Sequence, residues 1–204
     1  MIIIIGFFIP LAVIVLSTAA GMLGLISFEV FGIVLGVAFG TSIIVAVFVL
    51  VQFSAELTVR FAGFAQALGG KIRHNALGGR ILCLPHPRGS IEVEYHTLGG
   101  GKYTKSVHYT RVALLCGAGE LPRQHHVLTN TTEAQSLQPA AANEVAALFT
   151  LFGPPTQVRL AGKEQVPSVQ VWVPTWLEEP EVVKFVVESA RPHLEALAQG
   201  PWRL

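Results

Sequence analysis

Aspartate is absent from this chain of 204 residues, and all thirteen of its acidic residues are glutamates. The lack of aspartate excludes the usual EF-hand loop, the usual metal ligands of kinases and Walker-B motifs, and the commonest form of the hydrolase triad. Glutamate can replace aspartate in principle. The absence therefore lowers the expectation of an enzyme without removing it.

Charge is almost absent from the first 54 residues, where Glu29 is the only charged side chain. Two apolar runs, residues 2–25 and 31–53, are each long enough to cross a bilayer core of about 30 Å, which takes roughly 20 helical residues. The first run lacks a basic n-region and continues past its small residues, which argues against a cleaved signal peptide. The sequence therefore predicts a transmembrane helical hairpin over residues 1–54.

Lysine and arginine are missing from the turn between the two spans, whereas four basic residues follow the second span. These are Arg60, Lys71, Arg73 and Arg80. Basic residues near the ends of spans stay on the cytoplasmic side, and they favour an anionic leaflet. We therefore expect both termini in the cytoplasm, the four side chains at the membrane surface, and an integral protein of a bacterial inner membrane.

Ionisable groups are also missing from the interior of both spans, which makes an ion or proton pathway improbable. Small residues occur instead at helical spacing, and such faces let two helices approach closely in lipid. The predicted packing residues are Gly32, Gly36 and Gly40 of the second span, and Ser17, Gly21 and Gly24 of the first. Either the two spans pack on each other, or the glycine face docks the helix of another subunit.

Recognisable catalytic and cofactor motifs are lacking. The glycine-rich stretch 99–104 departs from a P-loop, the seven histidines show no HxH or HxxxH spacing, and neither CxxC nor G-x-S-x-G occurs. Cys83 and Cys116 lie in apolar runs and are expected to be small buried hydrophobes. The scattered basic residues do not resemble a nucleic-acid interface. We predict no catalytic residue, no metal, no cofactor and no nucleic acid partner.

Beyond the second span, residues 55–79 form an amphipathic helix and a glycine-rich connector. Leu57, Phe61, Phe64 and Leu68 recur at spacings of four, three and four, which is the period of a helix. This segment either prolongs the second span or lies along the membrane surface. A glycine pair ends it, and a second glycine pair nine residues later brackets a short element.

The remaining residues, 80–204, form one soluble domain with alternating patterns typical of strands. Strands are expected at 80–84, 90–96, 105–115, 123–129, 157–160 and 168–173, and helices at 143–152 and 179–198. Pro192 is expected to kink or split the last helix. This order predicts an α+β domain with helices packed on one face of an antiparallel sheet.

Aromatic side chains supply the candidate interface. Tryptophans and phenylalanines are most often core residues, but tryptophan is also enriched where binding energy is concentrated. The candidates for an interface with another subunit are Phe61, Phe64, Trp176 and Trp202.

Together these features predict a non-enzymatic, membrane-anchored accessory or scaffold subunit of a larger integral-membrane complex, with a photosynthetic or respiratory complex as the expected host. Its partners would be other integral-membrane subunits and membrane lipid. The alternative is a membrane-tethered module that binds a lipid headgroup, peptide or small ligand through its basic half. Residues 55–126 hold nine Lys/Arg against four Glu, whereas residues 127–204 hold five against eight.

Overall fold

The computed structural model describes residues 13–16, 18–20, 23–24, 27–75, 78–99, 105–116, 121, 125–161 and 166–199. The chain divides into two compact units, residues 1–58 and residues 59–204. One long helix begins in the first unit and ends in the second.

This helix, α2 (Phe28–Leu68), confirms the expected long apolar helix. Its 41 residues correspond to about 60 Å at 1.5 Å per residue, which exceeds the hydrocarbon core of a bilayer. Only 6% of its most apolar 18-residue window is buried, so its large side chains need a cover of lipid or protein. The helix continues past Phe53 and through Gly63 to Leu68, and it ends before Gly69, which takes a positive φ of 68°.

The first predicted span lies mostly outside the described residues. Residues 13–16 and 18–20 are helical, but a two-helix hairpin is not shown, and the hairpin remains a prediction.

The second unit contains a seven-stranded antiparallel sheet with the strand order β1-β2-β3-β4-β7-β6-β5. The strands are β1 (Lys71–His74), β2 (Arg80–His86), β3 (Gly89–Leu98), β4 (Val107–Leu115), β5 (His126–Leu128), β6 (Gln157–Ala161) and β7 (Ser168–Val173). Strand β1 is the short element between the two glycine pairs, and its type was not predicted.

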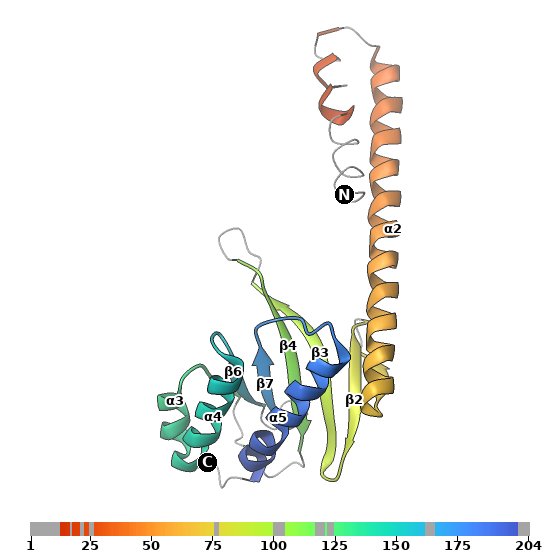
Figure 1. Ribbon diagram of the computed structural model, residues 1–204. Coiled ribbons are helices and arrows are strands. Elements are labelled where there is room, and N and C mark those ends of the chain that lie inside the picture. Colours follow the sequence, from red (N-terminus) through yellow and green to blue (C-terminus); the bar gives the residue numbers. More distant parts are fainter. Residues whose placement is uncertain are drawn as a thin grey trace. The chain divides into compact units, whose positions relative to one another are not determined.

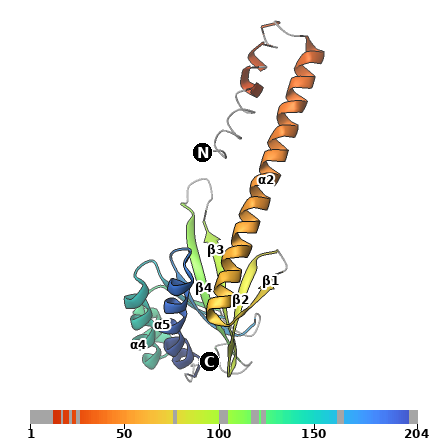
Figure 2. The ribbon, with the colours of Figure 1, turned by 45° about the vertical axis from the view of Figure 1, so that its right-hand side comes forward.

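Three helices, together with the last turns of α2, cover one face of this sheet, and Figures 1 and 2 show the three helices from two directions. They are α3 (Thr131–Leu137), α4 (Pro139–Phe152) and α5 (Pro180–Gln199). Their apolar faces share one core with the strands, including Val93, Val112 and Val171 from the sheet and Val145 and Leu194 from the helices. The described residues thus confirm a soluble antiparallel sheet domain with helices.

The helices differ from the prediction in three places. Helix α3 was missed because it is short, and it begins where the Asn130 side chain accepts a hydrogen bond of 3.0 Å from the backbone N–H of Glu133. Helix α4 begins at Pro139, since proline suits a first helical turn. The expected split of the last helix at Pro192 was wrong: α5 runs through this residue as one helix, with Ala190 and Leu194 buried on either side.

Candidate functional site: the open face of the sheet

The sheet face opposite the helices carries the most organised set of polar side chains in the second unit. Residues facing each other across neighbouring antiparallel strands point to the same side, and every second residue of a strand shares a face. The register pairs Glu94 with Arg111, His96 with Tyr109, and Arg111 with Trp172. We call this surface the open face, because among the described residues no helix packs against it (Figure 2). Its polar and aromatic side chains are Lys71, Arg73, Glu92, Glu94, His96, Tyr109, Arg111, Gln157, Arg159, Gln170 and Trp172.

Two buried glutamates and one arginine form the centre of the open face. Glu92 and Glu94 are only 4% and 7% exposed. The Nη2 atom of Arg111 lies 2.8 Å from Oε2 of Glu94 and 3.4 Å from Oε2 of Glu92. Arg73 adds a contact of 2.5 Å to Oε1 of Glu92 from the edge strand. Each buried carboxylate therefore has a cationic partner, as burial of charge requires.

Glu94 has two further donors. The Asn75 amide donates a hydrogen bond of 2.8 Å to Oε1, and Nε2 of His96 lies 3.0 Å from Oε2. Burial alone would raise the pKa of Glu94, but the hydrogen bond with His96 and the charge of Arg111 outweigh it, so the pKa lies below its ordinary value. Glu94 stays ionised at neutral pH and is poorly suited to act as a general acid.

Trp172 is the centre of the other half of the open face. Its ring lies 3.7 Å below the Arg159 guanidinium carbon, a cation–π contact. The rings of His96 and Tyr109 lie 4.6 and 5.9 Å from it, centre to centre. Its indole N–H donates a hydrogen bond of 2.9 Å to the Gln170 side-chain oxygen, and this bond holds the ring in one orientation.

Arg159 is a half-buried cation of this surface whose hydrogen bonds go to an amide oxygen. Its Nε and Nη2 atoms donate to the side-chain oxygen of Gln157, at 3.2 and 2.7 Å. Among the described residues, no carboxylate forms an ion pair with it. Burial lowers the pKa of Arg159 from its usual value, as expected for a half-buried cation without an anionic partner.

A second aromatic cluster lies on the helix-covered side of the sheet. Successive ring centres from Phe64 through Phe61, Tyr95 and Trp176 to His108 are 5.5, 5.1, 5.4 and 4.5 Å apart. The Tyr95 hydroxyl donates to the backbone carbonyl of Leu177, and burial raises the pKa of Tyr95 to about 12. We call this row of five rings the ladder; it joins the end of α2 to the sheet.

The predicted interface aromatics therefore have different positions. Phe61 and Phe64 are 1% and 0% exposed and belong to the core of the second unit. They are thus not available as a surface for another subunit, because the sheet already covers them. Trp176 is half-buried in the ladder, with its indole N–H 3.3 Å from the His96 carbonyl. Trp202 lies outside the described residues.

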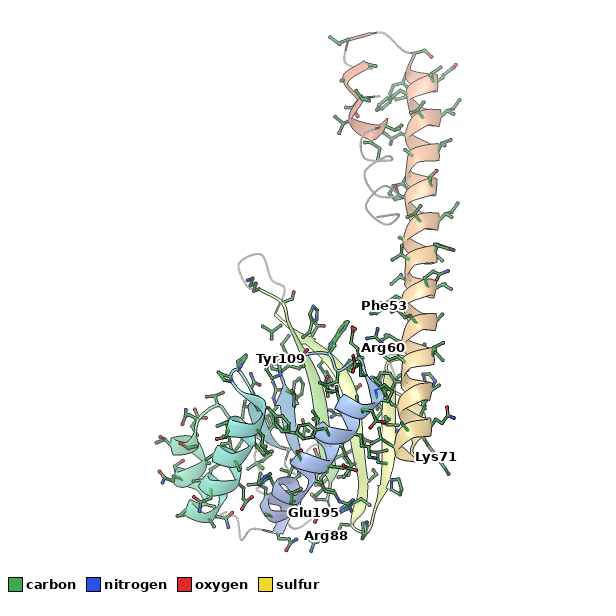
Figure 3. All side chains as sticks on the ribbon, viewed as in Figure 1. Phe53, Arg60, Lys71, Arg88, Tyr109 and Glu195 are labelled. Atoms are coloured by element: carbon green, nitrogen blue, oxygen red, sulfur yellow. The ribbon has the colours of Figure 1, made fainter. Side chains whose placement is uncertain are left out.

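The four predicted membrane-surface residues do not form one patch. Arg60 pairs with Glu178 at 2.9 Å, and Arg73 belongs to the open face. Figure 3 shows Arg60 on α2 and Lys71 just beyond the end of that helix, where β1 begins. Arg80 lies on β2 opposite His74.

The predicted glycine face is uncovered in the described part of the first unit. A Cβ atom added at Gly32, Gly36 or Gly40 would meet nothing within 4 Å there, and the same holds for Gly24, which has a positive φ of 67°. The less exposed stripe of α2 is a different one, formed by Phe31, Val34, Ala38, Ser42, Val45 and Val49. Ser17 and Gly21 lie outside the described residues.

Other reactive side chains are dispersed. Cys83 and Cys116 are half-buried thiols, and the described residues contain no group of three or more His, Cys, Asp or Glu that could hold a metal ion. Besides His96, two histidines lie beside glutamates, His86 at 2.8 Å from Glu195 and His193 at 2.7 Å from Glu144.

Lys71 and Arg73 were predicted as membrane-surface residues, but the other residues of the open face were not predicted as a site. The available signal was the alternation in β3, where Glu92, Glu94 and His96 share one side of a strand that is apolar on the other. That pattern is typical of a solvated strand, and nothing local indicates the arginine that neutralises it.

No protein-family model matches the sequence, and no curated protein or solved structure is significantly similar to it.

Proposed function

We propose that this chain is a non-enzymatic accessory subunit that is anchored in a membrane and docks a neighbouring subunit on the open face of its sheet. The observation that carries this proposal is the organised array of charged and aromatic side chains on that face, against which no helix packs among the described residues. Arginine and tryptophan are the residues in which interface binding energy concentrates. Fixed side chains also lose little conformational entropy when a partner binds.

The chemistry of the same side chains supports docking over catalysis. Both buried glutamates are held by arginine, and a general acid or base needs a pKa near the working pH. The pKa of Glu94 lies below its ordinary value, which moves this group away from that requirement. The carboxylates of the open face therefore suit a structural role.

The membrane anchor is the second part of the proposal. Helix α2 is long and apolar enough to span a membrane, and its exposed side chains include Ile33, Phe39, Ile44 and Leu50. We propose that residues 2–25 form a second span that pairs with it in a hairpin. The basic residues after α2 then place both termini in the cytoplasm of a bacterium, at its inner membrane.

Purification from membranes in a mild detergent tests this function. The expected result is an integral-membrane protein that co-purifies in a fixed stoichiometry with the full chain. A monomer that retains bound lipid and no protein would contradict the subunit proposal and favour the alternative, a tethered module for a lipid headgroup, peptide or small ligand.

Gly36→Leu should reduce the amount of co-purified partner, because a bulky side chain separates helices that meet over glycine. A loss of about 1–2 kcal/mol in association corresponds to roughly 5- to 30-fold. The matched control is Val37→Leu, at a position that is 65% exposed and off the glycine stripe. Equal recovery of partner from both variants would mean that the glycine face contacts lipid only.

Single alanine substitutions at Ser90, His108, His125, His126 and Glu144 should leave the host complex assembled and active. A catalytic group contributes typically 10²–10⁴-fold to a rate, whereas a scaffold distributes its binding over a surface. Complex activity and partner recovery are measured together for each variant. One variant that is fully assembled but inactive would contradict the non-enzymatic proposal.

A further inference from the structure

The open face has two electrostatically different halves. On strands β1, β3 and β4, the ion pairs neutralise Glu92 and Glu94 with Arg73 and Arg111. On strands β6 and β7, Arg159 has an amide oxygen and an aromatic ring as neighbours instead of a carboxylate. The described residues of this face include two negatively charged glutamates and four positively charged side chains, Lys71, Arg73, Arg111 and Arg159. An excess of positive charge therefore remains, and Arg159 is its most organised part.

Arg159 is held in position by the groups around it. Two of its five N–H bonds are used by Gln157, which leaves three donors of the planar fork. Its ring partner Trp172 is 5% exposed and is hydrogen-bonded to Gln170. The Gln170 amide in turn donates a hydrogen bond of 2.8 Å to the Ser168 hydroxyl. The guanidinium thus has N–H donors left over and a fixed plane. This arrangement can donate two parallel hydrogen bonds to a carboxylate.

An apolar side chain lies beside this arginine. The register of β5 and β6 pairs Val127 with Arg159 on the same face, and Val127 is 41% exposed. A free inorganic anion would use the arginine and leave the valine in water. A polypeptide that carries a carboxylate next to an apolar side chain would satisfy both.

We propose that the Arg159–Trp172 pair, together with Val127, is the anchor of the docking surface, and that it binds an acidic segment of the partner protein in which a glutamate or aspartate lies beside an apolar residue. This inference rests on the proposed function, because it names the chemistry of the partner that the open face would dock.

The test uses the full chain in detergent micelles and two fluorescein-labelled peptides of twelve residues. Both peptides have the same leucines, and every third residue is glutamate in one and glutamine in the other. Fluorescence anisotropy measures binding. The glutamate peptide should bind at least about tenfold more tightly, since a hydrogen-bonded charge pair contributes more than a neutral one.

Arg159→Gln should abolish this preference for the glutamate peptide, and Arg159→Lys should retain only part of it, because lysine keeps the charge but not the planar fork. The matched control is Arg191→Gln on α5, outside the open face. Arg191 already has a carboxylate partner, Glu195 at 2.8 Å, and its variant should bind like the unsubstituted protein. Circular dichroism and thermal melting establish that all three variants are folded.

Several results would overturn the inference. These are equal binding of both peptides, equal losses in Arg159→Gln and Arg191→Gln, or displacement of the peptide by sulfate at matched charge concentration. Binding of phosphatidylglycerol vesicles that depends on Arg159 while the peptide does not bind would assign the surface to lipid instead. The subunit proposal is tested separately. If a stoichiometric partner still co-purifies with Arg159→Gln, the proposed subunit function stands, and Arg159 is not the anchor.

Discussion

Replacing Arg111 by leucine should lower the free energy of unfolding by about 3–5 kcal/mol, the range measured when one partner of a buried ion pair is removed. Arg111 is the group shared by Glu92 and Glu94, and both glutamates are buried. Without it, Glu92 retains Arg73 and Glu94 retains only Asn75 and His96. Charge buried without an adequate partner is among the few mechanisms that give losses of this size.

Denaturant unfolding of the full chain in detergent, followed by tryptophan fluorescence, measures this loss at neutral pH. The control is Arg73→Leu, whose side chain is 61% exposed and whose loss should be about 1 kcal/mol or less, as for other solvent-exposed pairs. Losses of equal size in the two variants would contradict the assignment of Arg111 as the central cation.

The stability lost in Arg111→Leu should also depend on pH, and the pKa of Glu94 determines the direction of that dependence. The folded-state pKa of Glu94 lies below its value of 4.5 in the absence of the fold. Its contribution to stability is therefore complete above that value and disappears as the pH falls through the folded-state pKa. The difference between Arg111→Leu and the unsubstituted protein should shrink below about pH 4. A difference that stays constant there would mean that Arg111 acts through packing alone.

The fold class was predictable because it depends on local patterns. The alternation around Val93 indicates a strand with one apolar face, and the spacing of Phe61, Phe64 and Leu68 indicates a helix. Both patterns arise from the chain's own period, so no knowledge of neighbours is needed. The long apolar helix follows in the same way from the absence of charge.

The open face was not predictable because it depends on which strands are neighbours. Glu94 and Arg111 are seventeen positions apart, and Arg159 is separated from Trp172 by a hairpin; only the strand register places them together. For the same reason the sequence indicates that Phe64 is apolar but not what covers it. Pro192 shows the converse, because a packed helix face outweighs a local breaking signal.

Replacing Phe64 by alanine should lower the free energy of unfolding by about 3–5 kcal/mol. The side chain is 0% exposed, and its ring centre lies 5.5 Å from that of Phe61. Removal of the ring loses its burial and leaves a cavity, since a packed core relaxes only in part. The loss should detach the last turns of α2 from the sheet that they cover.

The matched control is Phe185→Ala on α5, where the ring is 61% exposed and the loss should stay within about 0.5 kcal/mol. The same unfolding measurement serves both variants. Recovery of the co-purifying partner separates a core role from a contact role for Phe64. If the ring acts only in the core, Phe64→Ala that is still folded at low temperature should recover as much partner as Phe185→Ala. A folded Phe64→Ala that loses its partner would instead mean that this position contacts another subunit, contrary to its burial here.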